Sequence, residues 1–262
     1  MNIADRVTVR QLFAAFATTG TKPPRAVSDA HARATKLVDK VRSLGAGEDA
    51  LSLAVAAAID AGNDPTADPA VQRALVASQI ANPGIVQAVD AIAFDHFRDV
   101  CKTHADDIVI AWRKPFDQAV AALSQAHGRL GAVNLSDTAA IVQMGGNAVE
   151  VWASAQAAEQ TIEATVAGWS GLGTFTGLAP LAPRYRVLRL AAVVDFEVWR
   201  TTNPGLTPWE AVLAGFTLDL PSFTGYRERV EAIEEQARLA ADQQRPVDRA
   251  RSHVAGHEIR VS

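Results

Sequence analysis

The stretch that decides the fold class is residues 82–111, "NPGIVQAVDAIAFDHFRDVCKTHADDIVIA". Asn82-Pro83 is a typical helix start, because Asn caps a helix and Pro suits its first position. The apolar positions that follow are spaced by three and four residues: Val86, Val89, Ala93, Phe97, Val100, His104, Ile108 and Ala111. This eleven-residue repeat, about 3.67 residues per turn, keeps one stripe along a long helix. We therefore predict a long helix from residue 83.

A second stripe follows the polar break "GAVNLSD" at 131–137. Its members are Ile141, Met144, Ala148, Val151, Ala155, Ala158, Ile162, Val166 and Trp169. Two long stripes joined by a short turn predict an antiparallel helical hairpin over 83–169, with a kink or restart at Pro115. The second arm, 136–169, would be about 50 Å long at about 1.5 Å per residue. Gly145-Gly146 inside it either allow close helix contact or mark a bend.

Start and stop signals predict helices in most of the remaining chain. The predicted helices are 8–20, opened by a Thr8–Gln11 capping box, 27–44, 48–61, one opened by Asp68-Pro69, one opened by Thr207-Pro208-Trp209-Glu210, and 224–243. On the last helix we expect the i,i+4 pairs Arg227–Glu231 and Glu234–Arg238. The run 184–200, "RYRVLRLAAVVDFEVWR", has helical spacing but is also compatible with a buried strand, so 186–199 stays open between helix and strand.

The chain is thus predicted to be an all-α, multi-helix protein with a long antiparallel hairpin and a C-terminal amphipathic helix. The expected organisation is a helical domain over 1–169 and a Gly/Pro-rich linker over 170–183, followed by a smaller helical segment over 184–244 packed on the first domain and a mobile tail over 245–262.

Composition excludes several classes of function. A net charge of -4 and a pI near 5.9 argue against a general nucleic-acid binder, which presents cations to phosphates. The single Cys101 leaves no internal disulfide. The sequence has neither a secretory leader nor an apolar run of the roughly eighteen residues that a membrane span needs. We expect a protein of the cytoplasm, or of a particle assembled there. Twenty arginines against five lysines, with abundant alanine, indicate a GC-rich bacterium or its phage.

The segment 96–107, "HFRDVCKTHADD", is the densest group of potential metal ligands. On a helix, His96 and His104 lie about 12 Å apart along the axis, too far to share one ion. Cys101 with His104, or His104 with Asp107, supplies only two ligands, whereas a zinc site needs three or four. We interpret His104 as a core or edge histidine and Cys101 as a small buried residue.

Two further motifs also have structural interpretations. His253 and His257 have metal-binding i,i+4 spacing, but Gly256 weakens a helix there and Glu258 does not fit the HExxH pattern or its inverse. The glycines of "GWSGLGTFTG", 168–177, lack the Gly-Lys-Ser/Thr of a phosphate loop and follow a helix. We interpret the first motif as part of a polar tail and the second as a hinge or loop.

Asp195 and Glu197 are the first place to look for an active site. They stand in apolar sequence, "VVDFEVW", and desolvation would raise the pKa of a buried carboxylate into the range of a general acid or base. Four neighbouring cations offer a structural alternative, in which the carboxylates form ion pairs: Arg184, Arg186, Arg189 and Arg200. We favour the structural pairing.

Trp169-Ser170-Gly171 resembles the turn of the WXG-type secreted helical hairpins, which are much shorter than this chain. In that family the motif lies between two helices of one hairpin, and the resemblance would imply a secreted effector. Here the motif ends a long arm, and position 230 is Val where the spacing from Tyr226 in their export signal calls for an acidic residue.

The leading hypothesis is a non-enzymatic helical structural or assembly protein, in its specific form a phage or prophage morphogenesis or particle component of a GC-rich bacterial host. Its partner would be itself or another protein, with no nucleic acid and no membrane, and the sequence predicts no catalytic, cofactor-binding or metal-ligating residue. The alternatives are a helical enzyme or small-ligand-binding protein with a site near Asp195 and Glu197, and a secreted WXG-like effector.

Overall fold

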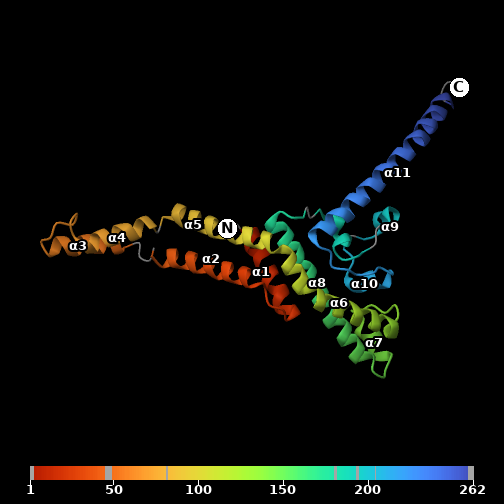
Figure 1. Ribbon diagram of the computed structural model, residues 1–262, viewed down its shortest axis with the longest axis horizontal. Coiled ribbons are helices and arrows are strands. Elements are labelled where there is room, and N and C mark those ends of the chain that lie inside the picture. Colours follow the sequence, from red (N-terminus) through yellow and green to blue (C-terminus); the bar gives the residue numbers. More distant parts are fainter. Residues whose placement is uncertain are drawn as a thin grey trace. The chain divides into compact units, whose positions relative to one another are not determined.

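The structure, a computed structural model, describes residues 3–44, 49–80, 82–179, 182–192, 195–203 and 205–258 (Figure 1). The chain is 78% helical, which confirms the predicted all-α class. The described residues contain no β-strand. The β pairing among them is an isolated antiparallel bridge between Ala191 and Leu218.

The chain forms two compact units. The first contains the residues up to Arg10 together with Lys22–Ile108, and the second contains Gln11–Thr21 and the residues from Val109 onward. Helix α1 (Ile3–Thr19) therefore contributes residues to both units. This division falls at residue 108, within the predicted domain 1–169, and not in the Gly/Pro-rich stretch that follows it.

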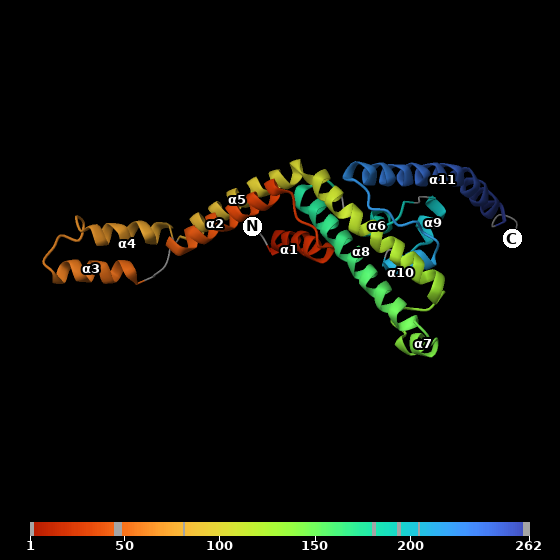
Figure 2. The same cartoon turned by 60° about the horizontal axis from the view of Figure 1, so that its bottom comes forward.

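In the first unit, α2 (Arg25–Leu44) packs against α5 (Pro83–Thr103), as Figures 1 and 2 show. Their buried residues are Val27, Ala30, Ala34 and Val38 on α2, and Asp90, Ala93, Phe94, Phe97 and Cys101 on α5. The spacing of Val27, Ala30 and Ala34 predicts that Leu37 comes next on the buried face of α2, but Val38 is buried and Leu37 is exposed. An alanine-rich helix can have more than one possible apolar face, and the contact with α5 determines which of them is buried.

A short hairpin of α3 (Ala50–Asp60) and α4 (Pro69–Ile80) connects α2 to α5. Asp68 caps α4 by accepting hydrogen bonds from the backbone N–H of Ala70 at 2.7 Å and of Val71 at 3.3 Å. Asn82 caps α5 by accepting from the N–H of Gly84 at 2.9 Å. Both starts are as predicted, because a capping side chain bonds its own first turn and needs no distant partner.

The predicted start of α1 is wrong. The helix already begins at Ile3, so Thr8 lies buried inside it and is not a cap. Asp5 stands in the first turn, where a carboxylate interacts favourably with the positive end of the helix dipole. This earlier start removes the need for a capping box at Thr8.

The long helix breaks at His104 and not at Pro115. Helix α5 ends at Thr103 and α6 (Ala105–Leu130) continues through Pro115. Asp106 and Asp107 occupy the first turn of α6, where carboxylates are favourable, whereas Asp is a poor residue for a helix interior. The break therefore lies where the acidic pair can form a helix start.

In the second unit, α6 and α8 (Ala148–Thr176) form the antiparallel pair that the sequence predicts, with shorter arms. Trp112 approaches Gly168 near one end of the pair, and Ala126 and Val151 line one groove near the other. Residues 83–103 of the predicted first arm pack against α2 instead.

The second arm is interrupted before α8. Helix α7 (Thr138–Gln143), capped by Asp137, is followed by Gly145 and Gly146 with φ of 64° and 56°, and α8 starts only at Ala148. A positive φ cannot continue a right-handed helix and is easily adopted by glycine. Of the two predicted roles of this pair, the bend is the one observed.

The predicted linker 170–183 is helical over its first seven residues. Helix α8 continues to Thr176 and ends at Gly177, whose φ is 70°. A Cβ on Gly168 would lie 2.4 Å from the Cβ of Ala15, and one on Gly173 would lie 3.1 Å from Phe223 Cε1. These glycines serve as close-contact positions on a helix, so their presence does not indicate a loop.

The rest of the second unit consists of short elements and one long helix: the 3-10 helix η1 (Pro183–Arg189), α9 (Phe196–Thr201), α10 (Pro208–Leu213) and α11 (Phe223–Glu258). The run that was open between helix and strand thus divides into η1, the bridge at Ala191 and α9. The capping box of α10 is confirmed, since Thr207 Oγ1 accepts from the N–H of Glu210 at 3.2 Å and Glu210 Oε2 accepts from the N–H of Thr207 at 2.8 Å.

Helix α11 packs against η1 and α9. Its buried side chains include Tyr226, Val230 and Ile233, which are spaced by four and three residues and so lie on one face of the helix. The predicted i,i+4 pairs are replaced: Glu234 accepts hydrogen bonds from Tyr185 and Arg184, and Arg238 pairs with Glu235. The backbone stays helical to Glu258, past the predicted end near 243 and through Pro246 and Gly256.

Trp169 anchors α8 to α11. Its ring is fully buried and stacks on Phe223 at a centroid distance of 4.7 Å, with Tyr226 edge-on at 5.0 Å. Its indole Nε1 donates a hydrogen bond to the carbonyl oxygen of Pro221 at 2.9 Å. The aromatic cluster buries a large apolar area while leaving no unpaired donor on Trp169.

The contact at Gly168 generates the first prediction. Gly168→Ala should lower the free energy of unfolding by about 1–3 kcal/mol, because the new methyl group meets Ala15 and Trp112. Urea unfolding followed by circular dichroism measures the change. Adding Ala15→Gly to this variant should restore part of the loss.

Gly128→Ala is the matched control, since Gly128 lies in α6 and a methyl group added there would meet no neighbouring element within 4 Å. This substitution should leave the stability unchanged or raise it by up to about 1 kcal/mol. Equal destabilisation by both substitutions would contradict the close-contact role of Gly168.

Candidate functional site

The histidine and cysteine segment 96–107 does not assemble a metal site. His104 Nδ1 and Asp107 Oδ2 are 2.8 Å apart, Cys101 is fully buried, and His96 is exposed. Among the residues that the structure describes, no group of three or more His, Cys, Asp or Glu side chains could hold a metal ion. The local pair His104–Asp107 forms as helical spacing predicts.

Cys101 is a buried apolar residue, as predicted. Burial raises the pKa of its thiol to about 12, because the thiolate would lose its hydration. At neutral pH the nucleophilic thiolate is therefore almost absent.

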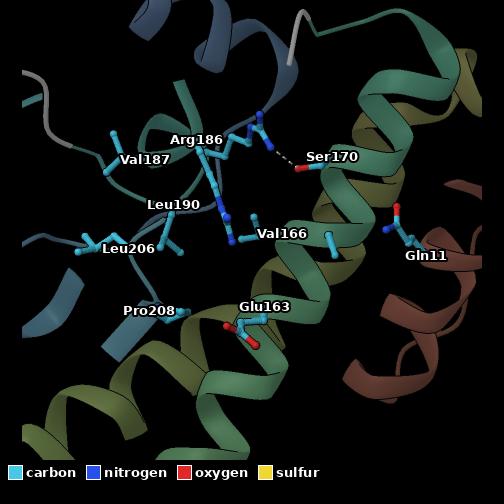
Figure 3. Close-up of a pocket in the computed structure, with 11 residues that line it drawn as sticks. Gln11, Glu163, Val166, Ser170, Arg186, Val187, Leu190, Leu206 and Pro208 are labelled. Carbon is cyan, nitrogen blue, oxygen red and sulfur yellow. Dashed lines mark hydrogen bonds between the residues drawn. The ribbon is translucent and has the colours of Figure 1, made fainter. Parts of the chain in front are cut away.

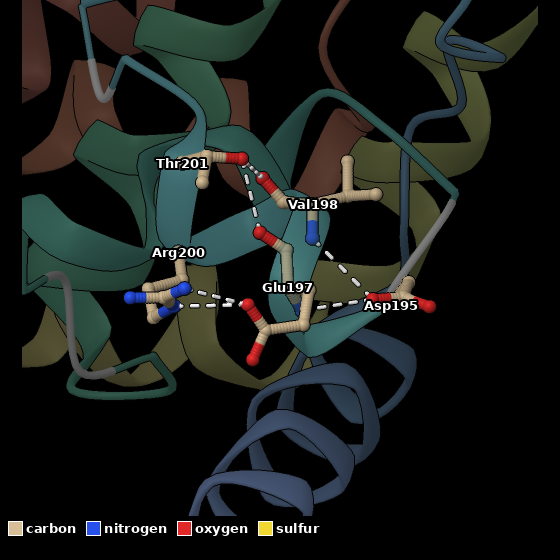
Figure 4. A network of polar contacts seen from close by, with 5 residues as sticks. All are labelled: Asp195, Glu197, Val198, Arg200 and Thr201. Carbon is tan, nitrogen blue, oxygen red and sulfur yellow. Dashed lines mark hydrogen bonds and ion pairs between the residues drawn. The ribbon is translucent and has the colours of Figure 1, made fainter.

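Asp195 and Glu197 are exposed, so the predicted apolar surroundings are wrong (Figure 4). Asp195 caps α9 by accepting hydrogen bonds from the N–H of Glu197 at 2.8 Å and of Val198 at 3.3 Å. Glu197 pairs with Arg200 at 2.7 Å, which confirms a structural pairing for this residue. Helix α9 has only six residues and none of them is buried, so it does not shield the two carboxylates from solvent. Even Val198 of this helix is exposed.

The other predicted ion-pair partners lie elsewhere. Arg184 pairs with Glu234 at 3.4 Å. Arg186 and Arg189 line a cavity against α8 and form no ion pair with Asp195 or Glu197. Ion-pair partners cannot be chosen from sequence proximity alone, because η1 directs successive arginines to different neighbours.

The remaining sequence motifs do not form sites in the described part of the chain. Trp169-Ser170-Gly171 lies inside α8, so it does not form the interhelical turn on which the WXG resemblance rests. The backbone of His253 and His257 belongs to α11, but the side chains of this segment lie outside what the structure describes.

The most distinctive surface is the α3–α4 hairpin, which we call the apolar hairpin. Residues 51–59 of α3, "LSLAVAAAI", contain no charge and one polar residue. Yet Leu53 is 68% and Ile59 62% exposed, and Leu75 and Val76 of α4 are also exposed. The buried residues recorded for the two helices are Ala58 and Val71.

A helix that is apolar on all sides is normally buried. Helix α3 packs against α4 but leaves large apolar side chains in solvent. The sequence predicts an apolar helix here, but not that it stays uncovered, because exposure depends on which other helices fold against it. We therefore take the apolar hairpin as the candidate functional surface.

The two helices of the apolar hairpin carry few charged side chains. Asp60 is the only charged residue of α3 and Arg73 the only one of α4. In the connecting turn, the backbone N–H and hydroxyl of Thr66 donate to Asp64 at 2.9 and 2.8 Å, which lowers the pKa of that carboxyl. A partner of this surface would be selected by shape and apolarity more than by charge.

Comparison with family models, with curated proteins and with solved structures finds no match for this chain. Among the described residues, no helix is both long and apolar enough to cross a membrane. The function must therefore be argued from the residues themselves.

The burial of Cys101 can be tested by its reactivity and by pH. Ellman's reagent should leave Cys101 unmodified in the native protein and modify it fully in urea, since the native thiol stays protonated. The unfolded chain ionises its thiol near pH 9, whereas the native pKa is about 12. Between these values wild type should lose stability relative to Cys101→Ala, by at most about 1.4 kcal/mol per pH unit. Rapid native modification would contradict this.

The structural role of Asp195 is tested by Asp195→Ala. Loss of the cap should lower the free energy of unfolding by about 1 kcal/mol, and urea unfolding measures it. Glu197→Ala is the control and should change stability little, because exposed ion pairs contribute weakly. A larger loss from Glu197→Ala than from Asp195→Ala would refute the assignment.

Proposed function

We propose that this chain is a non-enzymatic helical assembly protein that binds a second copy of itself through the apolar hairpin. The observation that carries the proposal is the exposure of Leu53 and Ile59 on a helix without a polar face. Large uncovered apolar surfaces of soluble proteins are typical of binding sites.

A second copy fits this surface for two reasons. Helices α3 and α4 carry one charge each, Asp60 and Arg73, so their partner should present an apolar surface, and the same hairpin on another copy does so. Helices α3 and α4 have similar lengths, 11 and 12 residues. Two such hairpins can bury their apolar sides in a four-helix bundle, which supplies the core that one hairpin lacks.

The finer form of the proposal is a phage or prophage particle component from a GC-rich bacterial host, assembled in the cytoplasm. It is supported by the excess of arginine over lysine and by the abundance of alanine. The enzymatic alternative at Asp195 and Glu197 has little support, because both carboxylates are exposed and engaged in a helix cap and an ion pair.

Sedimentation velocity across about 1–100 µM tests the proposal. Wild type should show a concentration-dependent shift from monomer to dimer or larger species. The double variant Leu53→Glu, Ile59→Glu should remain monomeric, because each association would bury four unpaired carboxylates. Both side chains are exposed, so the substitutions should leave the helical circular dichroism unchanged.

Ile110→Glu on α6 is the matched control, since Ile110 is 65% exposed but lies outside the apolar hairpin. It should associate like wild type. A wild type that stays monomeric over the whole range, or a double variant that associates equally well, would refute self-association. Co-sedimentation of the wild type with neutral phosphatidylcholine vesicles, lost in the double variant, would instead assign the surface to a membrane.

A further inference from the structure

A cavity of about 580 Å³ lies in the second unit, between α8, η1 and the residues around Leu206 and Pro208 (Figure 3). Glu163, Val166, Ala167 and Ser170 are spaced by three and four residues, so they form one face of α8 toward the cavity. The volume is within the range of about 300–1,000 Å³ that small-molecule sites occupy.

Arg189 is a partly buried cation in this cavity and forms no ion pair with the residues that the structure describes. Its Nη1 donates to Ser170 Oγ at 3.2 Å, and it lies beside the hydroxyl of Tyr226. Its Nε is buried and has no hydrogen-bond partner in the described part of the chain. Hydroxyls satisfy some of its donors but do not neutralise its charge, so a bound anion would compensate the cost of its burial.

Arg186 adds a second positive charge. It lines the same cavity and, among the described residues, forms neither a hydrogen bond nor an ion pair within 4.0 Å. Figure 3 shows Arg186 on the same side of α8 as Glu163. The pKa of Glu163 is raised by burial and by the nearby Glu159, while the charge of Arg186 partly opposes this rise. The charged residues lining the cavity are thus two cations and one carboxylate, in a protein of net charge -4.

Apart from Gln11 of α1, the remaining walls are apolar. Val166, Val187, Leu190, Leu206 and Pro208 line the cavity with aliphatic groups. A small hydrated anion would leave this surface in contact with water, whereas an organic anion would cover it. The site therefore combines an anion-binding end with an apolar compartment.

We propose that this cavity binds a small organic monocarboxylate, with its carboxylate at Arg186, Arg189 and Ser170 and its apolar body against Val166 and Leu190. Guanidinium groups bind carboxylates through charge-assisted hydrogen bonds, and two of them line this cavity. The single opposing carboxylate of Glu163 favours a monoanion over a dianion. This site lies on other residues than the apolar hairpin and does not depend on self-association.

Isothermal titration of the full chain with octanoate at pH 7.5 tests the proposal, with 1-octanol and inorganic phosphate as comparison ligands. Octanoate should bind, and both comparison ligands should bind at least about tenfold more weakly, since one lacks the charge and the other the apolar body. Arg186→Gln should weaken octanoate binding about tenfold or more. Glu163→Gln should strengthen it severalfold by removing the opposing charge.

Arg184→Gln is the matched control, because Arg184 belongs to the same 3-10 helix but pairs with Glu234 and does not line the cavity. Its octanoate affinity should stay within about twofold of wild type. Absence of octanoate binding at millimolar concentration, equal losses in Arg184→Gln and Arg186→Gln, or phosphate binding as tight as octanoate would each overturn the proposal. Circular dichroism confirms that each variant is folded, and Arg186 is exposed, so its loss should not affect folding.

Discussion

The second unit depends on the close approach of α8 to α1 and α6 at Gly168. A side chain at this position would collide with Ala15 and approach Trp112 within 3.2 Å, so only glycine permits the observed spacing. The next residue, Trp169, is fully buried against α11, and Ser170 faces Arg189 of η1. Three consecutive residues thus connect α8 to four neighbours, α1, α6, α11 and η1.

The first unit has no comparable constraint along its whole length. Helices α2 and α5 share a core of Phe97, Val27 and alanines, but the core does not extend into the apolar hairpin, where the large residues remain exposed. A segment that is folded but not covered is the expected location of a binding surface, since its apolar groups are still available to a partner.

Local chemistry explains which parts of the fold could be predicted. The starts of α4, α5 and α10 follow from Asp68, Asn82 and Thr207, whose side chains bond their own first turns. The predictions fail where the structure of a segment depends on contacts with residues far away in the sequence. Gly168 and Gly173 are typical of a loop in sequence, and their role as contact positions is evident only once Ala15 and Phe223 are placed against α8. The cavity could not be predicted either, because Arg186 and Arg189 are close in sequence to Asp195 but are directed by η1 toward α8.

Alanine-rich composition connects these observations. Alanine lets helices approach closely but buries little apolar area per residue, so such a fold depends on a few large anchors. Trp169 and Trp209 satisfy their indole donors with the carbonyl oxygens of Pro221 and Val133, whereas the buried Nε1 of Trp112 has no partner among the described residues. The fold thus tolerates the cost of one unpaired donor to keep Trp112 packed at the α6–α8 contact. Four exposed large apolar side chains on a single hairpin represent a substantial unused gain in stability, which association with another copy would realise.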